Sequence, residues 1–252
     1  MQEIFVEDVG SGTPLVLVHG FLGSSDMWHP QVDYFKEDFR VINPALPGFG
    51  KSRKVNSCDS IECMAKAILG FLELKKINQF NLLGHSMGGM IVQEMAKLAG
   101  EKILKLICYG TGPIGNIPGR FETIDQSREK LKIDGLESTA YRIAKTWFIK
   151  EDEAKYFYLC EEAVKQTSLE AADRGLIAMK NWTGVDNLKK IENKTLIIWG
   201  DKDKAYNYEQ VKTLNNKITD SELKIITGCS HNVHLEKPDE FNKTVIEFLK
   251  RT

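Results

Sequence analysis

A serine lies in the motif Gly84-His85-Ser86-Met87-Gly88, and its surroundings suit a nucleophile. The short apolar run 80–83 precedes the motif, and apolar residues at helical spacing follow it over 90–98. A strand, a sharp turn and a helix in this order hold a serine with its hydroxyl exposed. A Cβ at position 84 or 88 would collide with neighbouring backbone in so tight a turn, which accounts for both glycines. The sequence therefore predicts Ser86 as a nucleophile.

A serine hydroxyl needs a base to remove its proton. Two of the five histidines, His231 and His234, fall between the last predicted strand and the last predicted helix. We expect that loop at the carboxyl edge of the sheet, where catalytic groups of α/β proteins collect. His231 is nearer the strand end and is the predicted base, while His234 is expected to pack or to cap the helix. His85 is expected to point away from Ser86.

The base must itself be oriented by an acid, and an oxyanion needs N–H donors. Asp201 and Asp203 both follow the strand predicted at 195–199, and spacing alone does not separate them. The motif His19-Gly20-Phe21 closes the strand predicted at 14–18, and a glycine there lets backbone approach a ligand closely. The backbone N–H groups of Phe21 and Met87 are the predicted oxyanion-hole donors.

The elements that must position these groups alternate in type. Strands are predicted at 4–9, 14–18, 40–44, 80–83 and 104–109, with helices at 61–72 and 87–98. Such alternation predicts an α/β fold with a mostly parallel twisted sheet. Beyond the turn-rich segment 113–119, helices are predicted at 135–149, 152–166 and 168–179, before strands at 195–199 and 223–227 and a helix at 238–250. We therefore expect one domain, with a core of 1–113 and 184–252 and a helical cap inserted at 114–183.

Composition excludes several classes of protein. The 252 residues include 34 basic and 35 acidic ones, so the net charge of −1 gives no footprint for nucleic acid or an anionic membrane surface. No apolar run approaches the roughly 18 residues of a membrane span, and no signal peptide is visible, so the cytoplasm is the expected location. The five cysteines lack metal-ligand spacing and are expected to be reduced and mostly buried. We expect no metal and no cofactor.

Five motifs together resemble the α/β-hydrolase fold superfamily, and within it the esterase, lactonase and C–C-hydrolase group with a helical cap. They are HGF (19–21), LPGFGKS (46–52), GHSMGG (84–89), WGDKD (199–203) and SHNVHLEKP (230–238). The resemblance implies Ser86 as nucleophile, His231 as base, and the Phe21 and Met87 amides as oxyanion hole. It places the acid at Asp203 rather than Asp201.

The sequence departs from the family pattern in three places. Ser230 stands where the family often has glycine before the histidine, and Asn207 stands where a proline is common. The region before HGF has room for one strand where two are usual, so one N-terminal edge strand is expected to be missing. Neither substitution replaces a reacting group, but both bear on the geometry of the loops.

Three hypotheses for function follow. The first is a serine hydrolase that cleaves carboxylic esters of small molecules through an acyl-enzyme. The second is a lactonase or a C–C bond hydrolase with the same triad, and the third is a ligand-binding or signalling protein with little turnover. A mostly apolar substrate pocket is expected, with candidate lining residues Leu22, Trp28, Trp147, Phe148 and Trp182. The sequence does not indicate an oligomeric state.

Overall fold

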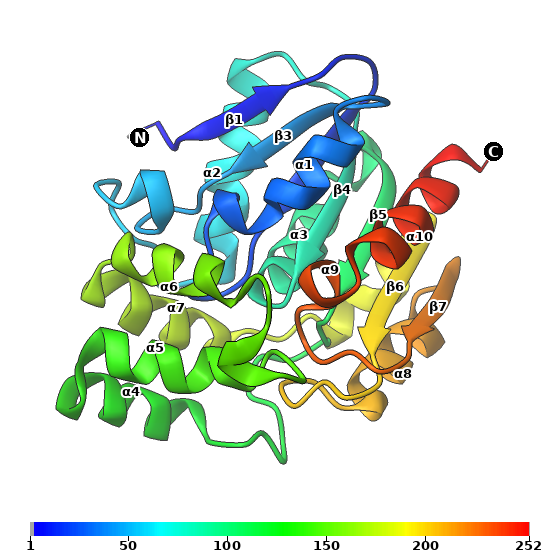
Figure 1. Cartoon of the computed structure of the whole chain (residues 1–252). Coiled ribbons are helices and arrows are strands. Elements are labelled where there is room, and N and C mark those ends of the chain that lie inside the picture. The colour runs from blue at the N-terminus through cyan, green and yellow to red at the C-terminus, as the bar shows by residue number, and fades with distance from the viewer. Residues whose placement is uncertain (1–2, 252) are drawn as a thin grey trace.

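A computed structural model describes residues 3–251, and its centre is a seven-stranded sheet (Figure 1). The spatial order of the strands is β1-β3-β2-β4-β5-β6-β7, and every neighbouring pair is parallel except β1 with β3. The predicted α/β fold with a mostly parallel sheet is confirmed. The strands are β1 (Val6–Val9), β2 (Pro14–Val18), β3 (Arg40–Pro44), β4 (Phe80–His85), β5 (Ile103–Tyr109), β6 (Thr195–Gly200) and β7 (Ser221–Ile226).

Helices cover both faces of the sheet, because the central strands are apolar on both sides. Along β2, Leu15 and Leu17 pack into one core cluster, whereas Val16 and Val18 pack into the other. The first cluster lies under α1 (His29–Phe35) and α10 (Pro238–Lys250), and the second under α2 (Ile61–Leu74), α3 (Met87–Ala99) and α8 (Tyr208–Lys217). The loops that follow β2, β4, β5 and β6 therefore meet at one edge, next to the short helix α9 (Val233–Glu236).

Four helices lie between β5 and β6, and Figure 1 shows them gathered beyond one end of the sheet. They are α4 (Ile124–Ile133), α5 (Gly135–Lys145), α6 (Phe157–Lys165) and α7 (Leu169–Asn181). The two ends of this segment lie side by side, since Ile114 and Thr183 form an antiparallel bridge and the Gly184 amide donates to the Pro113 carbonyl at 2.8 Å. The division into core and cap at 114 and 184 stays a prediction.

Helix boundaries in this segment differ from those predicted. The helix predicted at 135–149 ends at Lys145, and the helix predicted at 152–166 begins only at Phe157. Turns and the short 3₁₀ helix Glu151–Glu153 occupy the stretch between them. In this stretch Trp147 and Phe148 turn into the interior, so tertiary packing overrides local helix propensity.

The N-terminal edge of the sheet agrees with expectation. In residues 3–251, β1 alone precedes β2, and it pairs antiparallel with β3 through Val6–Pro44 to Val9–Val41. One strand stands where the resembled family commonly has two. Among the described helices, none combines the length and the apolar character that crossing a bilayer requires.

The prediction of five reduced cysteines is wrong in the structure. Cys58 and Cys63 form a disulfide, with Cα atoms 5.7 Å apart, while Cys108, Cys160 and Cys229 are free and buried. The pairing arises because Ser60 caps α2 by accepting from the Cys63 amide, which places the first helical turn beside Cys58. Two cysteines five residues apart do not form a sequence motif that indicates a disulfide. The expected cytoplasmic location stays a prediction.

Candidate active site

Ser86 lies on a strained turn between β4 and α3. Its backbone has φ +57° and ψ −117°, a region that L-residues seldom adopt. A Cβ on Gly84 would overlap the carbonyl oxygen of Gly88, and one on Gly88 would overlap that of Val18. The turn is held in place because the Ser86 amide donates to the Tyr109 carbonyl of β5 at 2.9 Å. This is the strand–turn–helix geometry that the motif predicts, with the serine at its apex.

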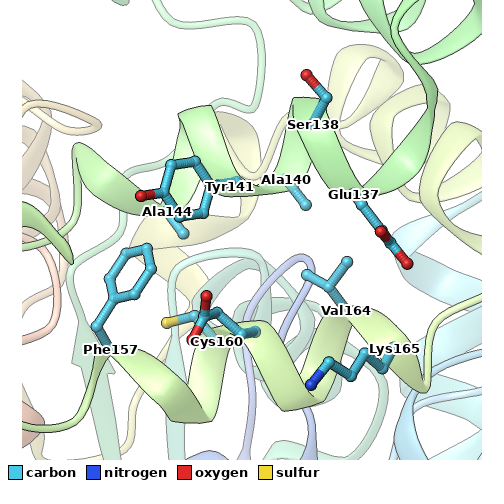
Figure 2. Close-up of a pocket in the computed structure, with 10 residues that line it drawn as sticks. Glu137, Ser138, Ala140, Tyr141, Ala144, Phe157, Cys160, Val164 and Lys165 are labelled. Atoms are coloured by element: carbon cyan, nitrogen blue, oxygen red, sulfur yellow. The ribbon is translucent and has the colours of Figure 1, made fainter.

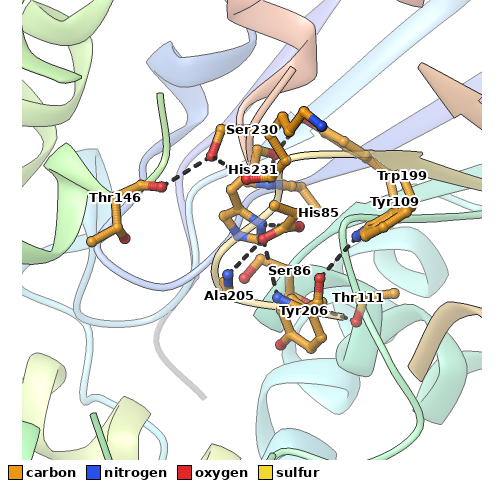
Figure 3. Close-up of polar contacts among 12 residues, drawn as sticks. His85, Ser86, Tyr109, Thr111, Thr146, Trp199, Ala205, Tyr206, Ser230 and His231 are labelled. Carbon is orange, nitrogen blue, oxygen red and sulfur yellow. Dashed lines mark hydrogen bonds and ion pairs between the residues drawn. The ribbon is translucent and has the colours of Figure 1, made fainter. Parts of the chain in front are cut away.

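The loop after β6 and the loop after β7 bring an aspartate and a histidine together (Figure 3). His231 Nδ1 lies 2.8 Å from Asp203 Oδ2, and both side chains are buried, at 1% and 0% exposure. The second carboxylate oxygen of Asp203 accepts from the amides of Ala205 (2.7 Å) and Tyr206 (3.0 Å). The carboxylate is thus held by three hydrogen bonds, one of which orients the imidazole.

Asp201, the other candidate acid, faces a different partner. Its Oδ1 accepts from the Gly228 amide at 2.6 Å, and its Oδ2 lies 3.4 Å from Lys202 Nζ. Burial opposes ionisation of Asp201, but the hydrogen bonds from Gly228 and Lys202 outweigh it and lower the pKa of the carboxyl. Asp201 therefore joins the loops after β6 and β7 and does not contact His231.

The imidazole of His231 lies in an aromatic cage beside Ser86. Its ring is stacked on Tyr206, with centroids 5.7 Å apart and planes at 18°, and lies 6.0 Å from the ring of Trp147. The backbone carbonyl of His231 accepts from the Tyr109 hydroxyl at 2.8 Å. Ser86 and His231 line the same small cavities. In enzymes without bound substrate, the distance between a catalytic serine and its histidine is often longer than in the reacting complex.

Three further histidines, His19, His85 and His234, are buried around the site, and we refer to them as the three buried histidines. Burial lowers the pKa of His19 to about 4 and that of His234 to about 3, and it holds the pKa of His85 well below its usual value. All three are therefore neutral near pH 7. His85 stacks on Tyr109 at 4.5 Å, and His234 packs on Trp28 at 4.7 Å.

The turn after β2 lies directly against the nucleophile. A Cβ on Gly20 would stand 3.0 Å from the Cβ of Ser86, and Phe21 lines the cavities next to Ser86. Met87 is the first residue of α3, so its amide is one of the N–H groups that a helix leaves unpaired. Among the residues that the structure describes, neither the Phe21 nor the Met87 amide donates to another protein group. Two such donors beside a serine could stabilise an oxyanion.

The two departures from the family pattern have structural roles. The Ser230 amide donates to Glu236 Oε2 at 2.6 Å, and its hydroxyl donates to the Thr146 carbonyl at 3.0 Å, which ties the His231 loop to the segment after α5. Asn207 is the N-cap of α8, where its side chain accepts from the Gln210 amide. Neither residue displaces Asp203 or His231.

The structure corrects part of the predicted substrate pocket. Trp147 does line the cavities at Ser86, and Trp28 lines the smaller one, behind the nucleophile. Phe148 instead packs against Phe157, and the indole of Trp182 donates to Glu94 Oε2 at 3.1 Å. Leu22 is 2% exposed within the core cluster. Phe148 and Leu22 are buried and Trp182 is partly buried, because burial of apolar area and of a paired indole N–H stabilises the core.

Several residues at the site escaped sequence reasoning. Tyr206, Arg120, Phe121, Ile117 and Met179 line a cavity together with Ser86 and His231. Tyr206 follows Asp203 by three residues, which could have indicated that it lies at the same edge. Arg120 ends a turn-rich segment without periodicity, so no sequence signal placed it there.

A roomier cavity of about 350 Å³ lies elsewhere, between α5 and α6. Figure 2 shows Tyr141 facing Phe157 at one end, with Glu137 and Lys165 at the other. Its apolar wall includes Cys160, whose sulfur accepts from Asn232 Nδ2 at 3.8 Å. Ser86 and His231 do not line it, so size alone does not identify the reactive site. In residues 3–251 no three acidic, histidine or cysteine side chains converge as metal ligands.

Comparisons with known proteins bear on the fold and the family of the chain. The family model described as "alpha/beta hydrolase fold" matches residues 13–238. A solved esterase from Exiguobacterium antarcticum superposes with a TM-score of 0.91 at 26% identity, over 98% of this chain and 96% of that one.

Curated relatives are similar over almost the whole chain. A 2-hydroxy-6-oxo-6-phenylhexa-2,4-dienoate hydrolase from Comamonas testosteroni is 26% identical over 98% of this chain and 91% of its own. The acetyltransferase component of an acetoin cleaving system from Pseudomonas putida is 28% identical over 95% of this chain, which spans 64% of that longer relative.

Proposed function

The chain belongs to the α/β-hydrolase fold family, as the sequence motifs predicted, and we propose that it is a serine hydrolase of carboxylic esters. The observation that carries the proposal is the buried contact of 2.8 Å between His231 Nδ1 and Asp203 Oδ2, next to a serine on a strained turn. In this proposal Ser86 is the nucleophile, His231 the base and Asp203 the acid. The similar esterase from Exiguobacterium antarcticum supports an ester as the substrate.

The geometry suggests how the reaction proceeds. Asp203 accepts a hydrogen bond from the Nδ1–H group of His231, so Nε2 is free to take the proton of Ser86 while Oγ attacks the ester carbonyl. The N–H groups of Phe21 and Met87 stabilise the oxyanion. His231 then gives the proton to the departing alcohol, which leaves an acyl-enzyme. Water attacks the acyl group with His231 again as base, and the carboxylic acid departs as Ser86 recovers its proton.

The test is a Ser86→Ala variant assayed on short 4-nitrophenyl esters, with a fluorophosphonate as an active-site label. We expect turnover and labelling of the native protein at Ser86, and loss of both in the variant with an unchanged melting temperature. Turnover retained by the variant would remove Ser86 as the nucleophile. If the native protein shows neither turnover nor labelling, a ligand-binding role is favoured instead.

A lactonase or C–C bond hydrolase activity is the second candidate. It is favoured by the similarity to the hexadienoate hydrolase from Comamonas testosteroni, because the same three residues could act on a different bond. A panel of esters, lactones and vinylogous diketones, with Ser86→Ala as the control, separates the two. The largest kcat/KM among the three substrate classes identifies the bond.

A further inference from the structure

One cationic side chain lines the cavity at the proposed nucleophile. Arg120, from the loop between β5 and α4, shares this cavity with Ser86, Tyr206 and His231. The remaining lining residues that the structure describes are apolar or glycine, and none of them is acidic. The guanidinium is therefore the only side chain of fixed charge on the described wall of this cavity.

The carboxylate of Glu122, whose charge acts on Arg120, does not pair with it. Glu122 is instead engaged by Arg142 at 2.6 Å, by Lys130 at 3.2 Å and by the Ser127 hydroxyl. Within residues 3–251, Arg120 forms neither a hydrogen bond nor an ion pair, and its guanidinium carbon lies 5.6 Å from the ring centre of Phe121. An arginine has five N–H donors that match a carboxylate in a two-point contact, so all of them are left without a protein acceptor here.

The surroundings of Arg120 make that lack of a partner costly. Burial lowers the pKa of the guanidinium, and the opposing effects of Tyr206 and Glu122 do not cancel this. A charge that is partly removed from water is destabilising unless it is paired and hydrogen-bonded. Burial also raises the pKa of Tyr206 to about 12, and its neutral hydroxyl is hydrogen-bonded with Ser86 and Thr111. The guanidinium of Arg120 thus presents donors to the cavity, and no carboxylate lies on the described wall.

We propose that Arg120 binds a carboxylate of the substrate, so that the preferred ester is one that carries a second, free carboxylate away from the bond that is cleaved. The proposal rests on the proposed function of Ser86, because the two residues share one cavity. A planar carboxylate accepts two parallel N–H bonds from a guanidinium, and the low dielectric of the site strengthens them. A neutral ester of the same shape leaves the charge unpaired.

The size of the cavity adds a condition on binding. Its free space is about 20 Å³, which is enough for a water molecule but not for a substrate. Part of the wall of this cavity must therefore shift when an ester enters. A carboxylate compensates for this shift with a new ion pair, whereas a neutral ester does not, so the selectivity is expected mainly in KM.

The experiment compares matched anionic and neutral esters. On the acyl side the pair is mono-4-nitrophenyl adipate and 4-nitrophenyl hexanoate, and on the alcohol side it is 4-acetoxybenzoate and its methyl ester. The variants are Arg120→Gln, which removes the charge, and Arg120→Lys, which keeps it. Lys132→Gln is the matched control, because it removes one positive charge from an exposed position on α4 that does not line the cavity.

We expect Arg120→Gln to lower kcat/KM for the anionic member of at least one pair about 10- to 100-fold, the range for a hydrogen bond to a charged group. The neutral member should change less than about threefold, Arg120→Lys should retain part of the preference, and Lys132→Gln should retain all of it. An anionic-to-neutral ratio that is unchanged by Arg120→Gln in both pairs would overturn the proposal.

A binding measurement separates this proposal from that for Ser86. In Ser86→Ala protein, titration calorimetry with 4-acetoxybenzoate and with its methyl ester reports affinity without turnover. Tighter binding of the carboxylate that is lost in the Ser86→Ala/Arg120→Gln double variant supports the anion site even if the native protein hydrolyses no ester. Equal binding of the two ligands refutes the anion site, whatever the outcome of the Ser86 test.

Discussion

Replacement of Asp203 by asparagine gives a sharp test of the buried pair. The Oδ1 atom of Asp203 accepts from the amides of Ala205 and Tyr206, and its Oδ2 contacts His231 Nδ1. In Asp203→Asn the new side-chain oxygen must stay with the two backbone donors, since an NH₂ group there would oppose them. The NH₂ group then points at His231.

The consequence is a change of tautomer. With an N–H donor facing it, Nδ1 of His231 becomes the acceptor and the proton moves to Nε2. That nitrogen can no longer take the proton of Ser86. A change of this kind costs about 10⁴-fold in kcat in a serine hydrolase triad, equivalent to about 5 kcal/mol of transition-state stabilisation. The shape of the loop is preserved, so the melting temperature should change little.

The control is Asp201→Asn, a chemically identical change two residues away. Asp201 contacts Gly228 and Lys202, and its side chain is 26% exposed. We expect less than about a threefold effect on kcat, because asparagine keeps the oxygen that accepts from Gly228 and only the contact with the exposed Lys202 is lost, which contributes at most about 1 kcal/mol to stability. The assay is the initial rate on 4-nitrophenyl butyrate, with thermal denaturation of both variants. A loss below tenfold in Asp203→Asn, or a larger loss in Asp201→Asn, would refute the reasoning.

Three further predictions concern stability. Gly88→Ala should destabilise the protein by about 1–3 kcal/mol, because the new Cβ meets the Val18 carbonyl. Gly70→Ala, in open space on α2, should instead stabilise the protein by up to about 1 kcal/mol. Urea unfolding measures both, and equal effects of the two substitutions would contradict the turn geometry. Trp182→Phe should lower the free energy of unfolding by about 1–2 kcal/mol through the lost hydrogen bond to Glu94 and leave kcat/KM unchanged. A raised KM would instead indicate that Trp182 contacts the substrate. In the unfolded chain the three buried histidines become protonated below about pH 6.5. In the native state burial keeps two of them neutral to about pH 3–4 and the third to well below pH 6.5, so the free energy of unfolding should fall from pH 6.5 towards pH 4, by up to about 1.4 kcal/mol per pH unit for each histidine. A flat profile of unfolding free energy against pH, measured by urea titration, would show that they are not neutral in the native state.

Local chemistry in the sequence was enough to predict most of the frame. Alternating apolar runs predicted the parallel sheet, because both faces of a central strand must be covered. The glycines at 84 and 88 predicted the tight turn at Ser86, because only residues without a Cβ fit there. These features depend on neighbours a few residues apart, which is why one sequence suffices to reveal them.

Contacts between distant segments needed the tertiary structure. Spacing treated Asp201 and Asp203 alike, and only the packing of the loop after β7 against the loop after β6 brings Asp203, and not Asp201, to His231. The contact between the indole of Trp182 and Glu94 likewise joins segments far apart in the sequence.

The same holds for the charge at the cavity. The sequence predicted a mostly apolar pocket, and the net charge, as a sum over the chain, does not say where one cation lies. In the tertiary structure the turn-rich segment before α4 brings Arg120 to the cavity that Ser86 lines, although the two residues are 34 positions apart in the sequence. Sequence alone thus determined the reactive types and their supporting turn. Tertiary structure decided which groups meet, because side-chain contacts across loops follow from packing and not from spacing.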